Sequence, residues 1–294
     1  MVYALLLLAT MLYGGNLIAF RVAAPLMPPV VLAALRCLIS FLALAAFQRF
    51  LPTRPRPLRA ADVRDFTILG FTGMAFVSLA MFLGMRTTTA TNASIIYTST
   101  PAIVAIASVL FLGERVTWRA ASGILLSLLG VLVVLTNGSL ETLQSLRFNR
   151  GDLLIFAAAV SWSAYLVHSR HVLRRFDPWR ATCYATAVGS LMLSIAASFA
   201  APLQALASST LLAWGLILYL SILGLGVPFL ISNYALQQIG ASRTAIFQNM
   251  IPIFAMLFGW LLLNERIGAP QIAGAVLVIL GVLLVTRRRL ASRP

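Results

Sequence analysis

The sequence contains no lysine and only seven acidic residues, and charged residues make up 10% of its 294 positions. A soluble domain carries roughly a quarter charged residues. Hydrophobic residues make up 61% of the chain. Apolar stretches long enough to cross a ~30 Å membrane core, about 20 residues each, follow one another along nearly its whole length. The composition therefore excludes a soluble domain and predicts a helical protein that crosses a membrane many times.

Residues that usually carry chemistry are equally scarce. The chain has two histidines and two cysteines, and Cys37 and Cys183 both lie inside apolar runs. Neither a disulfide framework nor a metal-binding spacing exists. A membrane enzyme would need carboxylates, histidines or a nucleophile with a base at one depth, and the sequence offers no such cluster. We expect no catalytic residue, no metal and no cofactor.

The formal net charge is +15, because all 22 basic residues are arginines. They occupy short gaps between apolar runs and never form a stripe on an amphipathic helix, so nucleic-acid binding is not expected. The expected partners are the lipid bilayer and a small-molecule solute. The N-terminal run MVYALLLLATMLYGG lacks a basic start and a cleavage site. We interpret it as a retained first span rather than a signal peptide.

Ten membrane spans are predicted, all of them helices. They cover residues 2–21, 29–49, 65–85, 89–112, 117–136, 151–171, 178–199, 210–235, 241–263 and 270–286. Sixteen arginines fall in the gaps and tail on one side of the membrane and five on the other. Because positive residues accumulate in cytoplasmic loops, both termini are predicted to face the cytoplasm.

The chain also repeats itself. When residues 101–134 are compared with 252–285, 12 of 34 positions match, including Glu114/Glu265 and Arg115/Arg266. The first spans align at a shift of 149, which pairs Pro29 with Pro178. We therefore predict two five-span repeats, over 1–136 and 150–286, followed by a basic cytoplasmic tail over 287–294. Five is odd, so the second repeat must be inverted, as is typical of secondary transporters.

Matched prolines and glycines indicate which spans bend and which pack. Pro101 and Pro252 lie near the middle of their spans, and Gly226 lies in the GLGVP run of the eighth span. A mid-span proline frees a carbonyl and bends a helix, so these three residues are predicted to form the bends that let gates move. The glycines of the fifth and tenth spans are expected to form a packing seam. The Glu-Arg pairs are interpreted as helix junctions, with salt-bridge gating as the alternative.

Polar and aromatic side chains inside spans are the candidates for a binding cavity. They are Tyr13, Asn16, Asn92, Tyr97, Thr98, Trp162, Ser163, Tyr165, His168, Asn233, Tyr234, Gln248 and Asn249. Buried amides need partners in lipid, so these side chains must face the bundle interior, where bonding between helices competes with solute contact. The residues predicted to contact a solute are Asn16, Tyr97, Trp162, Tyr165, Asn233 and Gln248.

Arg36 is the one arginine well inside a span, about two turns into the second. An intramembrane ionisable residue is a functional candidate. Two interpretations stay open: Arg36 binds free carbonyls or snorkels, or it docks a carboxylate or phosphate of the solute. No acidic residue lies at mid-span, so we expect facilitated or exchange transport rather than a carboxylate-driven proton antiport.

The motifs MLYGGNLIAFRVA, PPVVLAALR and GDLLIFAAAVSWSAYLV, together with the proline and Glu-Arg pattern of the fourth and ninth spans, resemble the EamA-like branch of the drug/metabolite transporter superfamily. The resemblance covers essentially the whole chain. It implies a bacterial inner-membrane exporter with a central cavity lined by spans 1, 3, 4, 6, 8 and 9. Small multidrug relatives use a carboxylate in span 1, where this chain has Asn16, so their proton-coupled exchange is not carried over.

These observations predict a carrier that exports small amphipathic metabolites, with amino acids or related compounds as the preferred class. A two-repeat chain would need no partner subunit to complete its pathway. The alternatives are an exporter of a metallophore or drug-like cation, or a lipid scramblase or structural membrane subunit.

Overall fold

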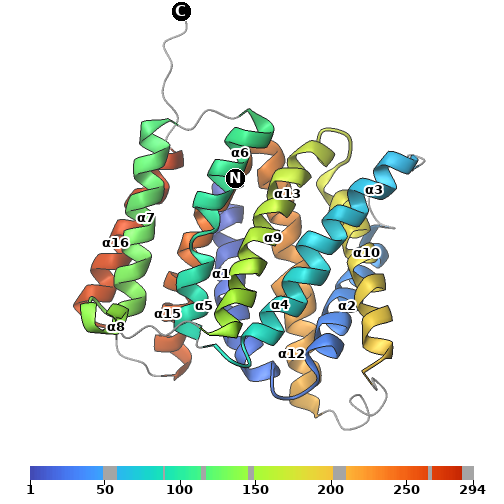
Figure 1. Ribbon diagram of the computed structural model, residues 1–294, viewed down its shortest axis with the longest axis horizontal. Coiled ribbons are helices and arrows are strands. Elements are labelled where there is room, and N and C mark those ends of the chain that lie inside the picture. The colour runs from blue at the N-terminus through green and yellow to red at the C-terminus, as the bar shows by residue number, and fades with distance from the viewer. Residues whose placement is uncertain are drawn as a thin grey trace, which may run out of the picture.

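The computed structural model describes residues 1–48, 58–88, 90–113, 117–144, 149–200, 210–263 and 267–286. Within these ranges the chain is helical and forms no strand. The helices stand roughly side by side as one bundle (Figure 1). The predicted Glu-Arg junctions at 114–115 and 265–266, and the basic tail at 287–294, lie outside the described residues.

The helical elements follow the predicted spans closely. In the first half they are α1 Val2–Ala23, α2 Pro29–Gln48, α3 Ala60–Leu69, η1 Gly70–Ala75, α4 Phe76–Gly84, α5 Ala90–Tyr97, α6 Thr100–Leu112, α7 Trp118–Thr136 and α8 Leu140–Gln144. In the second half they are α9 Arg150–Val172, α10 Pro178–Ser198, α12 Leu211–Ser221, η2 Ile222–Gly226, α13 Val227–Ile239, α14 Ala241–Ala245, η3 Ile246–Met250, α15 Ile251–Leu263 and α16 Ala269–Thr286.

Nine helical segments of the described chain are long and apolar enough to cross a membrane. The remaining predicted span, 241–263, is divided into α14, η3 and α15, of 5, 5 and 13 residues, none of which reaches that length alone. The three follow one another without a gap and together span the predicted range. Whether they form a tenth crossing remains a prediction.

Four of the spans are interrupted by irregular helix. The third and eighth predicted spans each contain a π-helix, η1 and η2, and both π-helices hold two glycines. The fourth predicted span breaks at Thr98–Ser99 between α5 and α6, and the ninth tightens into the 3-10 helix η3. Such interruptions leave backbone groups for side chains or ligands to satisfy, and they occur frequently at functional sites.

Helices α7 and α16 form a pair at one edge of the bundle (Figure 1). They approach closely because glycines face backbone in both: a methyl group on Gly130 would lie 2.6 Å from the Gly274 carbonyl oxygen. A methyl group on Gly281 would lie 2.5 Å from the Gly123 carbonyl oxygen. The four glycines therefore form the seam of this pair, which is how small residues bring membrane helices together.

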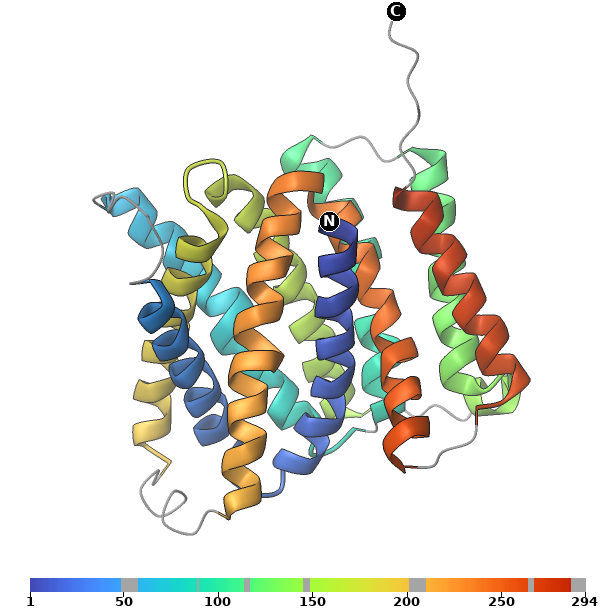
Figure 2. The same ribbon diagram turned by 180° about the vertical axis from the view of Figure 1, so that it is seen from behind.

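The start of α1 and the end of α16 lie at the same end of the bundle (Figure 2). The Tyr3 hydroxyl donates to the Thr286 carbonyl oxygen at 3.4 Å. A cluster of charged residues lies at this end, where Arg175 binds both Asp62 and Asp65 of α3, and His168 of α9 contacts Asp65. We call this end the terminal end, and the other the remote end.

Candidate functional site

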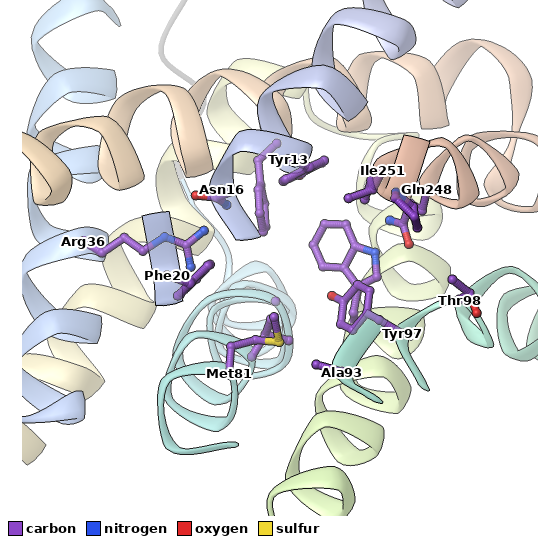
Figure 3. Close-up of a pocket in the computed structure, with 15 residues that line it drawn as sticks. Tyr13, Asn16, Phe20, Arg36, Met81, Ala93, Tyr97, Thr98, Gln248 and Ile251 are labelled. Atoms are coloured by element: carbon purple, nitrogen blue, oxygen red, sulfur yellow. The ribbon is translucent and has the colours of Figure 1, made fainter. Parts of the chain in front are cut away.

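A cavity lies among α1, α2, the α3–η1–α4 segment, α5, α9, α13 and the η3–α15 segment (Figure 3). It holds about 800 Å³ of space free of atoms, counting the part open to the outside. Its lining residues are Tyr13, Asn16, Phe20, Arg36, Gly73, Val77, Met81, Ala93, Tyr97, Thr98, Trp162, Phe229, Gln248, Ile251 and Pro252. A mostly apolar lining with a few polar groups is typical of small-molecule sites.

The cavity extends from the middle of the bundle toward the remote end. Phe20 lies near the end of α1, Met81 near the end of α4 and Ala93 near the start of α5, all at the remote end (Figure 1). At the terminal end, the lining includes no residue from the first turns of α1. There Tyr3 stacks on Phe247, with ring centroids 5.7 Å apart. Helix α1 and η3 are therefore in contact near the terminal end.

Arg36 approaches the cavity from α2 and is buried. Its Nε donates to the Leu220 carbonyl oxygen and its Nη2 to the Gly224 carbonyl oxygen, each at 3.1 Å. Its Nη1 donates to Ser78 Oγ at 3.1 Å, and its guanidinium lies 4.7 Å from the centroid of the Phe20 ring. The first interpretation of Arg36, that it binds free carbonyls, thus describes part of its role; solute docking remains a prediction.

Asn16 lies beside Arg36 and shares one of its acceptors. Its Nδ2 donates to the Gly224 carbonyl oxygen at 2.9 Å. Because this bond fixes which amide atom is the nitrogen, Oδ1 is the free end, and it has no hydrogen-bond partner among the described residues. Asn16 fits here because Gly224 has no side chain; a methyl group at that position would collide with the amide.

Trp162 belongs to an aromatic cluster on the α9 side of the cavity. Its ring stacks on Tyr165 at a centroid distance of 5.0 Å and meets the edge of Phe229 at 4.7 Å. Tyr165 does not line the cavity but lies behind Trp162, fully buried, with Asn233 Nδ2 donating to its hydroxyl at 2.7 Å. Asn233 also donates to Thr182, at 2.8 Å, so the Tyr165–Asn233 pair supports the wall rather than forming its surface.

Tyr97 and Gln248 line the side of the cavity opposite Arg36 (Figure 3). Each stands next to a helix break: Tyr97 ends α5, and Gln248 lies within η3. Gln248 Oε1 and Trp162 Nε1 are buried polar atoms without a hydrogen-bond partner in the described chain. A buried unsatisfied polar group is costly, so these atoms are places where a polar ligand would be stabilising.

The three predicted bend residues lie at irregular points of the helices. Pro101 is the second residue of α6, just after the break at Thr98–Ser99, and Pro252 is the second residue of α15, just after η3. Gly226 ends the π-helix η2. Pro252 lines the cavity, whereas Pro101 and Gly226 do not. A role in gate movement remains a prediction for all three.

Several lining residues were not selected from the sequence. Phe20, Val77, Met81, Phe229 and Ile251 are apolar, and among so many apolar residues nothing distinguishes them. Gly73 also lines the cavity, and a side chain at this position would collide with the ring of Tyr165. When the two halves of the sequence are compared at a shift of 151, Gly73 pairs with Gly224. This pairing is the sequence signal that could have identified Gly73. The described residues contain no group of three or more His, Cys, Asp or Glu that could hold a metal ion.

The chain is similar in sequence to known families and proteins. A sequence model described as the EamA-like transporter family matches residues 1–136 and 149–287. The chain is 31% identical over 223 residues to the uncharacterized transporter YyaM of Bacillus subtilis, which covers 74% of this chain and 72% of that protein. It is 28% identical over 290 residues to an uncharacterized transporter of Archaeoglobus fulgidus, covering 98% of both.

Two further comparisons concern a substrate and a fold. A probable terminal-alkyne amino-acid exporter of Streptantibioticus cattleyicolor is 26% identical over 248 residues, covering 82% of this chain and 79% of that protein. A solved crystal structure aligns with a TM-score of 0.73 at 18% identity, over 95% of this chain and 98% of the other. At that identity the structural likeness concerns the fold alone.

Proposed function

The chain belongs to the EamA-like transporter family, and from this premise we propose that it is a secondary transporter that exports small amphipathic metabolites, amino acids or related compounds, by alternating access. It is a multi-pass membrane protein, and its relatives are transporters. The observation that carries the proposal is the central cavity, with its aromatic wall and its unsatisfied polar atoms. The name of the Streptantibioticus relative supports the amino-acid class.

Two inverted five-helix repeats are part of the proposal, and pairs of matched contacts support them. Asn16 of α1 lies against Gly224 of η2, and Tyr165 of α9 lies against Gly73 of η1. The two contacts are equivalent in the sequence comparison: a shift of 149 relates Asn16 to Tyr165, and a shift of 151 relates Gly73 to Gly224. The π-helices η1 and η2 and the interruptions after Tyr97 and around Gln248 are related in the same way. One chain then supplies both halves of the pathway, and a monomer is sufficient.

We further propose that the terminal end faces the cytoplasm of a bacterial cell, with the protein in the inner membrane. The excess of arginine in the gaps on that side supports this orientation. Since the cavity extends toward the remote end, the conformation is then outward-facing, closed on the cytoplasmic side by the packing around Tyr3 and the cluster around Arg175. Opening inward would require the halves to rock, with the breaks near Pro101, Gly226 and Pro252 as bends.

Efflux from cells preloaded with labelled amino acids, metallophore-like chelates and cationic dyes tests the transport proposal. Trp162→Phe retains an aromatic ring and removes the Nε1 donor, so efflux of the transported compound should fall about three- to tenfold, the value of one hydrogen bond. Trp118→Phe is the matched control, because Trp118 is 91% exposed. An equal loss in both variants would contradict the assignment of the cavity. A correctly inserted protein that moves lipid but no solute would favour the scramblase.

The orientation has its own test by cysteine labelling. Cys37 and Cys183 are both buried and can be replaced to provide a cysteine-free background. A membrane-impermeant maleimide should label Arg86→Cys, after α4, in intact cells, and Arg174→Cys, after α9, only in permeabilised cells. Both positions are exposed arginines, so they serve as controls for each other. The opposite labelling pattern would reverse the proposed topology and, with it, the outward-facing assignment.

A further inference from the structure

Arg36 is a charged residue in the lining of a mostly apolar cavity. It is the one charged side chain among the lining residues, and it is 5% exposed. The described acidic residues lie elsewhere: Asp62 and Asp65 bind Arg175, Asp177 binds Arg180, Asp152 caps α9, and Glu141 is exposed. Within the described chain, no carboxylate therefore neutralises this guanidinium. A charge buried away from water is normally paired, and this one has only neutral partners.

The guanidinium has hydrogen-bonding capacity left over. An arginine side chain carries five N–H donors in a planar fork. Three are used, by the carbonyl oxygens of Leu220 and Gly224 and by Ser78 Oγ, so Nη1 and Nη2 each retain one. In Figure 3 the side chain reaches from α2 toward Asn16 and Phe20, at the edge of the cavity. The two remaining donors suit a carboxylate, whose oxygens accept charge-assisted hydrogen bonds.

Support of the π-helix does not by itself require a cation at this position. A shift of 149 places Ala185 of α10 at the position equivalent to Arg36. There α10 packs against η1 directly: a methyl group on Gly70 would lie 2.9 Å from the Ala185 carbonyl oxygen. Ser161 Oγ donates to the Thr72 carbonyl oxygen of η1 at 2.8 Å. The π-helix η1 thus has an uncharged residue where η2 has Arg36, so a π-helix in this bundle does not need a cation beside it.

We infer that the transported solute carries a carboxylate and that Arg36 receives it in the cavity. The inference rests on the proposed function and names the solute group that this site recognises. Polar atoms without partners complement such a solute: Trp162 Nε1 is a further donor, and Gln248 Oε1 can accept from a hydroxyl or ammonium group. The uncompensated charge of Arg36 repels cations, so the inference predicts that drug-like cations without a carboxylate bind more weakly than carboxylate-bearing solutes.

The test uses the wild-type protein in proteoliposomes. Counterflow of labelled leucine and phenylalanine is measured in competition with the unlabelled acids and with leucinamide and phenylalaninamide, which have lost only the carboxylate. The amide of a transported acid should compete at least tenfold more weakly. An amide that competes as well as its acid would overturn this inference and leave the carrier intact. Failure to transport acids or amides would overturn the proposed amino-acid carrier and this inference with it.

Variants then assign the preference to the residue. Arg36→Gln removes the charge and keeps a hydrogen-bonding side chain, and its fold is checked by gel filtration because Arg36 also holds two backbone carbonyls. In folded Arg36→Gln the preference for acid over amide should disappear. Arg36→Lys retains the charge without the planar fork and should preserve part of the preference. If folded Arg36→Gln keeps the full tenfold preference, the carboxylate is recognised elsewhere and the assignment to Arg36 is wrong.

Discussion

Replacing Arg175 with methionine is expected to lower the free energy of unfolding by roughly 3 kcal/mol. Arg175 donates to Asp62 Oδ1 at 2.7 Å and also binds Asp65. The side chain of Asp62 is fully buried and that of Asp65 is 5% exposed. Removing one partner of a buried ion pair leaves an uncompensated charge, which costs about 3–5 kcal/mol. The lower end applies because Arg175 is 30% exposed and Asp65 keeps its contact with His168.

The loss is measured as the midpoint of thermal unfolding in detergent, which we expect to fall by roughly 5–10 °C. Arg174→Met is the matched control, since Arg174 is the exposed neighbour in the same turn, and it should change the midpoint little. The triple variant Arg175→Met, Asp62→Asn, Asp65→Asn should recover much of the stability because the stranded carboxylates are gone. Equal midpoints for the two methionine variants would contradict the structural role of this cluster.

Gly281→Ala is expected to cost roughly 1–3 kcal/mol, the range for overpacking a tight core. The new methyl group would lie 2.5 Å from the Gly123 carbonyl oxygen and 2.7 Å from the Ser127 backbone nitrogen. Both contacts are backbone, so no side chain can turn away and α16 must move off α7. Neither helix lines the cavity. Transport per folded molecule should therefore stay near the wild-type rate while the yield of folded protein and the unfolding midpoint fall.

The same glycine-to-alanine change at position 215 is expected to raise stability rather than lower it. Gly215 lies within α12 and a methyl group there meets nothing within 4 Å. Alanine favours helix over glycine by about 0.5–1 kcal/mol, so this variant should be slightly more stable than wild type. If Gly281→Ala proved as stable as Gly215→Ala, the close approach of α7 and α16 would be wrong.

Periodic and compositional features of the sequence predicted the helical spans well, because every apolar run must form its backbone hydrogen bonds internally in lipid. Nine of the predicted spans correspond to helical segments of sufficient length. Two features were beyond such reasoning. Span 3 begins at Ala60, earlier than predicted. Asp62 accepts from the Arg59 backbone N–H at the start of α3, and Arg175 and His168 from a distant part of the chain bind Asp62 and Asp65. Span 9 is broken into three short helices around Gln248.

The candidate site was predicted in part. Asn16, Arg36, Tyr97, Trp162 and Gln248 were selected because each carries a polar group, and polar groups are costly in lipid unless they face the interior. All five line one cavity. The same argument could not separate lining from support. Asn233 donates a hydrogen bond to Tyr165 behind the wall. Which buried polar side chain finds a protein partner depends on distances between helices far apart in the chain.

The sequence by itself determined that this chain is a helical membrane protein and, through its motifs, which family it belongs to. Composition and motif spacing are local properties, and lipid restricts the backbone to helices. Only the tertiary structure decided that Arg36 meets the carbonyls of η2 and that Trp162 and Gln248 border one space. The reason is physical: a cavity is the volume left when helices from both halves pack, and its position follows from close contacts such as that of Asn16 with Gly224.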